Sequence, residues 1–162
     1  MSKKLLTLLV MCLTTCTAVA DEIPKGDKVE AKVYTKPYFE KNNSGLMGDA
    51  SFLAIADQKG FDMVFGVGFV MGKKPDLLPK DAFDKKMVLG VIKRGNMVFE
   101  YKDVAVTKTD GVLYVAYMAT GKGAGGTAKF ASPLIVEIPK GEYKSVVFFE
   151  NGKKAGTAEM KK

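Results

Sequence analysis

The run Met87-Val88-Leu89-Gly90-Val91-Ile92 opens the stretch that decides the fold, which extends from Lys86 to Glu150. The run is apolar without alternation, a pattern that predicts a strand covered on both faces. Compact turn signals separate it from further apolar runs at Met97–Phe99, Val112–Met118, Leu134–Ile138 and Val146–Phe149. Short β-rich runs at this spacing predict an antiparallel meander.

Two turn dipeptides and one change of apolar phase, in and beside this stretch, predict where the chain turns or bulges. Asp110-Gly111 and Asn151-Gly152 are dipeptides that favour two-residue hairpin turns. The second predicts a polar edge strand over Lys153–Met160, whose lysines discourage pairing with another chain. After Met97 the apolar residues change phase near Lys102-Asp103, which predicts a β-bulge. A strand that bends between two sheets, or a barrel corner, would follow from it.

The part of the chain before Lys86 predicts two strands and one helix. Val29–Tyr34 alternates apolar and polar residues, and Ala50–Ala56 is a second β-rich run. Asp57 can cap a short helix over Gln58–Phe65. Thr120–Ser132 is polar and rich in glycine, which predicts a long loop. The predicted fold is mainly β: an antiparallel β-sandwich or a partly open barrel with one short helix.

Residues 1–20 predict a signal peptide. Lys3 and Lys4 precede the apolar run Leu5–Leu13, and a small-residue cleavage site ends at Ala20. The run is too short to span a bilayer, and no other stretch is longer, so no transmembrane segment is expected. Cys16 stands in a lipobox-like context, but the Thr before it fits poorly, and a lipid anchor is the disfavoured alternative. We therefore expect an exported chain, periplasmic or secreted, with an outer-surface lipoprotein as the alternative.

The residue inventory excludes several kinds of chemistry. Both cysteines lie within residues 1–20, and the chain has no His or Trp. Cleavage after Ala20 would therefore leave neither a Ser–His nor a Cys–His nucleophile, and it would remove the usual zinc and copper ligands. Asp76, Asp81 and Asp84 lack the spacing of a calcium loop. We expect no metal, no cofactor and no enzyme activity.

Two further features, a glycine-rich motif and the net positive charge, could indicate nucleotide or nucleic-acid binding, but their sequence context argues against both. Gly121–Gly126 is a literal G-x-G-x-x-G, but the chain then runs into Pro133, and no βαβ unit surrounds it. A flexible loop is therefore the better interpretation of these glycines. The net charge of +7 is dispersed in lysine doublets with acids nearby. Nucleic acid is not expected as a partner, because its binding requires a clustered basic face.

The order of these features resembles a known family. The features are Ser44-Gly45, Phe52–Ile55, the helix around Phe61, Asp81-Ala82-Phe83 before Met87–Ile92, Asp110-Gly111, Ser132-Pro133 before Leu134, and Val146–Phe149. Together they resemble the C-terminal domain of the bacterial PrcB family of protease-complex-associated polypeptides. The resemblance implies an exported β-rich domain, over residues 44–160, that stabilises a cell-envelope or secreted protease complex. The family often carries a Thr-Gly-Gly-Tyr-like hairpin where this chain has Arg94–Met97, so no family role is carried over to that turn.

These observations predict a non-catalytic binding or complex-assembly module. Residues 21–43 would form a lead-in and first strand before the β domain. The predicted binding loops contain Phe69, Val70, Met71, Arg94, Asn96, Lys122 and Lys129, and the segment Phe69–Met71 is either a short edge strand or an exposed loop tip. One alternative is a small-ligand binder with an apolar inter-sheet pocket lined by Phe99, Tyr101, Tyr114 and Tyr117. A second alternative is a hydrolase that uses carboxylate or Ser–Lys chemistry.

Overall fold

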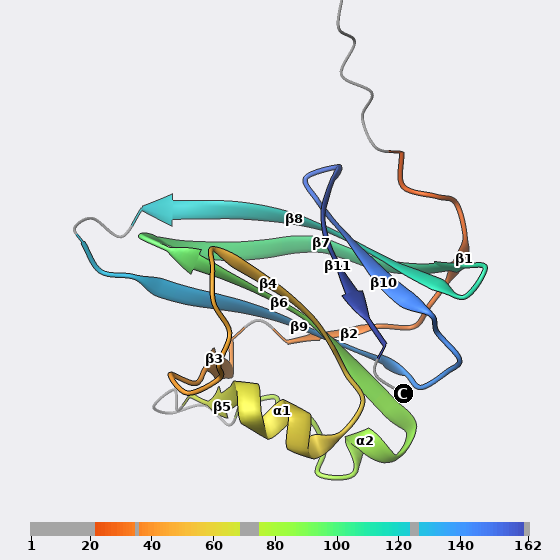
Figure 1. Ribbon diagram of the computed structural model, residues 1–162, viewed down its shortest axis with the longest axis horizontal. Helices are drawn as coiled ribbons and strands as arrows, with labels where there is room; N and C mark the ends of the chain where they lie inside the picture. The colour runs from red at the N-terminus through yellow and green to blue at the C-terminus, as the bar shows by residue number, and fades with distance from the viewer. Residues whose placement is uncertain (1–21, 35, 69–74, 124–126, 161–162) are drawn as a thin grey trace, which may run out of the picture.

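The computed structural model describes residues 22–34, 36–68, 75–123 and 127–160, which form three sheets and two short helices (Figure 1). Sheet A has the strand order β1 (Asp27–Lys28), β7 (Met97–Thr109), β8 (Val112–Gly123), β10 (Ser145–Glu150) and β11 (Lys153–Glu159). Sheet B has the order β2 (Lys32–Tyr34), β9 (Phe130–Pro139), β6 (Lys86–Gly95) and β4 (Ala50–Ile55). The remaining elements are a ribbon of β3 (Tyr38–Glu40) with β5 (Phe65–Val67) and the helices α1 (Gln58–Val64) and α2 (Ala82–Lys85).

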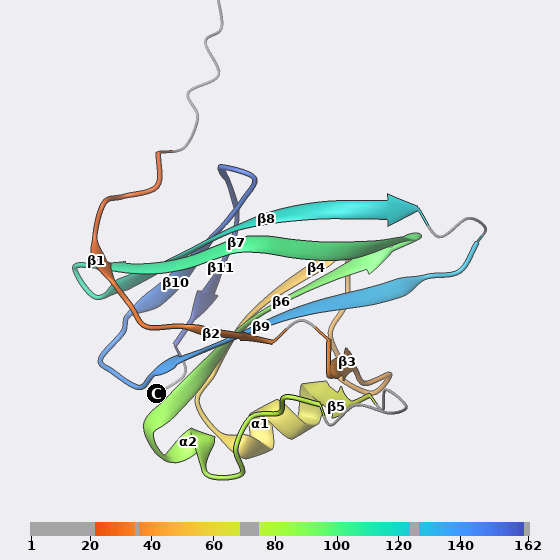
Figure 2. The ribbon, with the colours of Figure 1, turned by 180° about the vertical axis from the view of Figure 1, so that it is seen from behind.

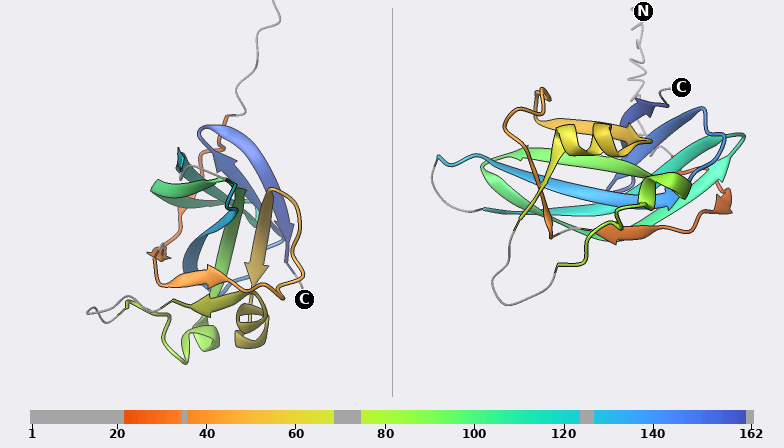
Figure 3. Two further views of the ribbon diagram at one scale, coloured as in Figure 1. Left: turned by 90° about the vertical axis from the view of Figure 1, so that its left-hand side faces the viewer. Right: turned by 90° about the horizontal axis from the view of Figure 1, so that it is seen from below.

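Sheet B is the middle layer of the molecule. One of its faces packs on sheet A through a core that includes Leu89, Leu113 and Phe148. Its other face, which includes Val88, Ile92 and Ile135, is covered by α1, α2 and the ribbon (Figure 3). Each fully buried aliphatic side chain of this kind contributes about 1.5–3 kcal/mol. The predicted β-sandwich is confirmed, and so is the prediction that Met87–Ile92 is covered on both faces.

The prediction of a meander is wrong, because the chain crosses between the two sheets after β6, after β8 and after β9. β6 is followed by β7 in sheet A, β9 lies in sheet B, and β10 returns to sheet A parallel to β8. Burial explains this order. β9 is buried on both faces, and among the described residues sheet B is the sheet with an apolar core on each of its faces. It therefore takes a place between β2 and β6, and its neighbours in sequence cross to sheet A (Figure 2).

The predicted turns and the bulge are confirmed. Asp110 and Gly111 have φ values of 52° and 82°, and Asn151 and Gly152 have values of 51° and 78°. Left-handed conformations at both central residues are typical of type I′ hairpin turns. The register of β7 on β8 shifts between Lys102 and Ala105. β7 nevertheless pairs with β8 on both sides of the bulge, so it stays in sheet A and the predicted bend between sheets is wrong.

The N-terminal elements agree in part with the prediction. α1 begins after Asp57, whose carboxylate accepts a hydrogen bond of 2.7 Å from the Gly60 amide, and it buries Phe61. Phe65, predicted as helical, already belongs to β5. Only Lys32–Tyr34 of the predicted first strand pairs with β9, and there Tyr34 is buried while Val33 is 37% exposed.

Other differences concern elements that the sequence did not predict. The helix α2 and the ribbon β3–β5 had no clear signal in the sequence. The predicted loop over Thr120–Ser132 is too long at both ends, because β8 extends to Gly123 and β9 begins at Phe130. In the described ranges no helix is long and apolar enough to cross a membrane.

Candidate functional site

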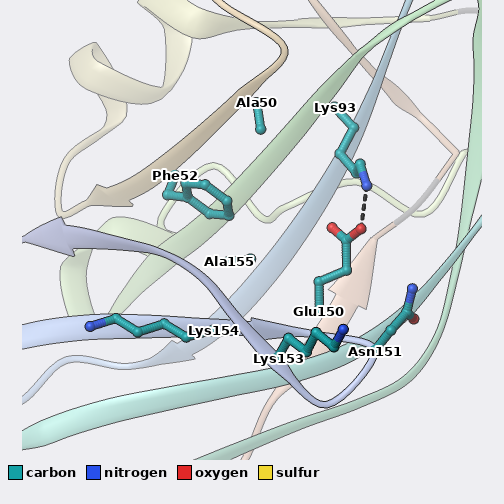
Figure 4. Close-up of a pocket in the computed structure, with 8 residues that line it drawn as sticks. All are labelled: Ala50, Phe52, Lys93, Glu150, Asn151, Lys153, Lys154 and Ala155. Carbon is teal, nitrogen blue, oxygen red and sulfur yellow. Dashed lines mark hydrogen bonds and ion pairs between the residues drawn. The ribbon is translucent and has the colours of Figure 1, made fainter. Parts of the chain in front are cut away.

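Two hollows lie on the described surface. The first, which we call the edge groove, has a volume of about 590 Å³ and lies between the outer strands β4 and β11 (Figure 4). It is lined by Ala50, Phe52, Lys93, Glu150, Asn151, Lys153, Lys154 and Ala155. The second, the end pocket, has a volume of about 430 Å³. It is lined by Phe39, Glu40, Lys41, Asn42, Ser44, Leu46, Arg94, Lys129, Phe130 and Ala131.

The two sheets come into close contact beside the edge groove, where β4 meets β11. The Phe52 ring packs directly on the backbone of β11, where a Cβ atom on Gly156 would come within 2.3 Å of the ring. Glycine is therefore required at this point for the two strands to approach each other. The groove opens from this contact toward Ala50 and Lys153 (Figure 4).

An ion pair forms the inner wall of the edge groove. Lys93 Nζ donates to Glu150 Oε1, and Tyr117 Oη donates to Glu150 Oε2 at 3.2 Å. The Lys93 ammonium also lies 4.2 Å from the centroid of the Phe99 ring. The side chains of Lys93 and Glu150 are only 18% and 21% exposed, so each charge is compensated by the other. This network joins β6, β8 and β10.

The tyrosines beside this ion pair stay protonated at neutral pH. Burial and the neighbouring Glu150 carboxylate raise the pKa of Tyr117 far above its usual value. Burial also raises the pKa of Tyr101, whose hydroxyl donates to the Ser132 carbonyl oxygen at 2.6 Å. Both phenols therefore act as hydrogen-bond donors that fix the sheets and not as acids or bases.

The four aromatic residues of the small-ligand alternative do not line one cavity. Tyr101 and Tyr117 pack edge to face, with ring centroids 5.8 Å apart, against the core between the sheets. Tyr114 lies on the opposite face of sheet A, where its ring centroid is 6.4 Å from that of Phe149. The reason is the alternation of side chains along β8, which sends Tyr114 away from its neighbour Val115 in the core.

The end pocket is built around the side chain of Arg94. Its Nε and Nη2 donate to the two carboxylate oxygens of Glu40 at 2.7 and 2.6 Å, and its Nη1 donates to the Gly48 carbonyl oxygen and to Ser51 Oγ at 3.1 and 3.0 Å. Ser44 Oγ donates to Glu40 as well, at 2.7 Å. Burial by itself would raise the pKa of Glu40, but the hydrogen bonds from Arg94 and Ser44 hold that pKa below its usual value.

The predicted binding loops that the structure describes come to the same end of the sandwich. Gly95 pairs with Phe130, and Met97 pairs with Gly123, which brings the 94–97 turn beside the end of β8 and the start of β9. Lys129 is exposed and lines the end pocket.

The other predicted residues have different surroundings. Arg94 makes the intramolecular contacts given above, and Asn96 is exposed at the tip of its turn. Lys122 forms an ion pair of 2.8 Å with Glu100 on the outer face of sheet A. Phe69, Val70 and Met71 lie outside the described residues.

The sequence interpretation missed the aromatic residues of both hollows. Phe39 and Phe130 belong to no recognisable motif, so no local signal could have found them. Lys153, Lys154 and Phe52 had weaker signals, since the lysine doublet follows a hairpin turn and the run around Phe52 carries no charge. Within the described residues, no group of three His, Cys, Asp or Glu side chains could hold a metal ion.

Comparison with protein-family models, curated proteins and solved structures finds no match for this chain.

Proposed function

We propose that the protein is an exported, non-catalytic module that binds a partner protein through the end pocket. The observation that carries this proposal is the exposed aromatic ring of Phe39 beside Arg94 and Lys129 at one end of a rigid sandwich. Protein interfaces are enriched in aromatic and arginine side chains, and a few such anchors supply most of the binding free energy. The leader-like residues 1–20 support export.

The position of the Phe39 ring is already fixed before a partner binds. It is 47% exposed, and its ring packs above Gly66, where a Cβ atom would come within 2.5 Å of Phe39 Cζ. The ring therefore loses little conformational freedom when a partner covers it, which lowers the entropic cost of association. Its strand β3 is paired with β5, which joins it to the layer that covers sheet B.

The charges of the end pocket favour recognition over catalysis. Arg94 and Glu40 satisfy each other in a bidentate ion pair, which leaves Lys129 as an exposed charge at the rim. A rim lysine of this kind steers a partner and contributes to specificity. The partner class follows from the PrcB-like order of features: a protein of the cell envelope or a secreted protease complex, which this module would stabilise.

The test is affinity capture of the mature chain from its own cell envelope, compared across matched variants. Phe39→Ala and Lys129→Glu are expected to reduce capture of the same partner at least about fivefold, since truncating an interface anchor costs more than about 1 kcal/mol. Lys144→Glu is the control, because Lys144 is exposed beside the β7–β8 turn at the opposite end of the sandwich. Circular dichroism verifies that each variant is folded. Failure to capture any partner, or equal capture by all variants, would refute the proposal.

A further inference from the structure

The edge groove lies between two strands that each have a free side. In the described part of the chain, β4 pairs only with β6 and β11 only with β10. A free strand side presents backbone N–H and C=O groups that another chain can pair with. We propose that the free side of β4 accepts a short, extended, acidic segment of a partner protein by strand addition. This surface is different from the end pocket, and the inference does not depend on it.

The two strands differ in how well they are protected against such pairing. β11 carries Lys153 and Lys154, and its register on β10 shifts between Phe148 and Phe149. Lysines and bulges are the devices by which edge strands avoid pairing with other chains. β4 has the sequence Ala-Ser-Phe-Leu-Ala-Ile and carries no charge, so neither device protects it. β4 is therefore the receptive edge.

The contact at Gly156 sets the length of the segment that fits. The Phe52 ring meets the backbone of β11 there, and Phe52 is the last residue of β4 that lines the groove. The free side is open from Ala50, which is exposed, to Phe52, which is half-buried. Three residues of a strand span about 10 Å, so the added strand is short. Its side chains would alternate between the side of sheet B that faces Phe52 and β11 and the opposite side.

The charge of the groove selects an acidic segment. Lys93 and Glu150 neutralise each other in its wall, whereas Lys153 and Lys154 form no ion pair with any described residue and make a positive rim. Both lysines are exposed and extend in opposite directions along β11 (Figure 4). Asp49 is exposed and immediately precedes β4, so it places a negative charge on the side of the groove across from β11. An added strand with its acidic residues toward β11 would match this polarity.

A second copy of this chain fits the groove less well than an acidic partner does. The chain carries a net charge of +7, and cleavage after Ala20 would remove only Lys3 and Lys4 from it, so two mature copies still repel each other, and the same lysine rim would meet in both.

The start of β4 is already fixed before a segment binds. The Arg94 amide donates to the Asp49 carbonyl oxygen at 2.8 Å, and Arg94 Nη1 donates to Ser51 Oγ at 3.0 Å. These bonds fix the start of β4 and lower the cost of pairing with it.

The probe for this inference is a fluorescein-labelled peptide of about six residues, with blocked ends, in which Asp alternates with Val. Fluorescence anisotropy is expected to show binding with a dissociation constant below about 1 mM. Amide NMR signals of Ala50–Phe52 and Lys153–Ala155 are expected to shift. A Lys-for-Asp version of the peptide should bind at least about tenfold more weakly, because its charge matches that of the rim.

Two sets of variants separate charge attraction from strand addition. Lys153→Glu with Lys154→Glu is expected to weaken binding of the acidic peptide about tenfold, whereas Lys28→Glu with Lys144→Glu, an equal charge change at remote exposed sites, leaves it unchanged. N-methylation of the peptide removes backbone donors without altering the protein. Because alternate amides of a strand point to the same side, methylation in one phase should abolish binding and methylation in the other should be tolerated.

Several results would overturn the inference. Equal binding of both N-methylated peptides would show charge attraction without strand pairing. Unchanged affinity of the variant with both rim lysines replaced, or NMR shifts outside β4 and β11, would place the peptide elsewhere. A concentration-dependent dimer without peptide binding would assign the groove to a second copy. None of these results involves Phe39 or Lys129, so a failure here is distinguishable from a failure of the end pocket.

Discussion

Replacement of Arg94 by alanine tests the central electrostatic feature of this structure. The guanidinium makes two hydrogen bonds to Glu40 and one each to Gly48 and Ser51. It thereby joins β6, the β3 ribbon and the start of β4, and it borders the end pocket while fixing the strand that forms the edge groove. Arg94→Ala would leave the Glu40 carboxylate, whose side chain is 9% exposed, without its cation.

The expected cost of Arg94→Ala is about 3 kcal/mol of unfolding free energy. Removing one partner of a buried ion pair costs about 3–5 kcal/mol, and the 18% exposure of Arg94 places this pair at the lower end of that range. For a chain of this size, such a loss corresponds to a fall in Tm of about 6–12 °C. Arg94→Lys keeps the charge but loses the bidentate geometry, so we expect it to cost about half as much.

The assay is urea unfolding of the chain and both variants at neutral pH and again at about pH 3.5. Because the folded state holds the pKa of Glu40 below its unfolded value of about 4.3, the ion pair stabilises the fold fully above that pH. This contribution is lost as the pH falls through the folded-state pKa. The difference between wild type and Arg94→Ala should therefore shrink in acid. A cost below about 1 kcal/mol at neutral pH would refute the assignment of Arg94 as a structural clamp.

Three further predictions concern other parts of the chain. Gly156→Val should destabilise the fold by about 1–3 kcal/mol in thermal unfolding, because its side chain would collide with the ring of Phe52, whereas Gly123→Val, with nothing within 4 Å, should be nearly neutral. Burial and a hydrogen bond to the buried Glu137 carboxylate raise the pKa of Tyr34 to about 12. The free energy of unfolding should therefore fall as the pH rises from about 10 to 12, and it should fall less in Tyr34→Phe. An equal slope of this free energy against pH in both proteins would contradict the prediction. Mass spectrometry of the exported chain should find Asp21 at its N-terminus, and a different terminus would contradict the leader assignment.

Local chemistry explains which predictions from the sequence are confirmed. The Asp110-Gly111 and Asn151-Gly152 turns depend on two residues that tolerate positive φ, and the α1 cap depends on Asp57 alone. The β7 bulge follows from a phase change visible within one strand. Such features require no knowledge of which strands become neighbours.

The candidate sites were much less predictable than the fold class. The sequence indicated the loops around Arg94 and Lys129, and the structure brings these together at one end. It could not indicate that Arg94 would be bound by Glu40, because the two residues are 54 positions apart and no motif links them. Phe39 could be identified as a candidate binding residue only from the structure, in which Gly66 and the β3–β5 ribbon hold its ring at the surface.

By itself, the sequence determined that β6 is covered on both faces, that the chain turns at its Asp-Gly and Asn-Gly dipeptides, and that the fold is mainly β, because these follow from side-chain periodicity and backbone conformation. Only the tertiary structure decided the partners of each strand. The parallel pairing of β10 with β8 and the meeting of β4 with β11 at Gly156 depend on how two sheets and a covering layer share the apolar surface of the whole chain. Both hollows result from this long-range strand pairing and sheet packing, since each is bordered by segments that are distant in the sequence.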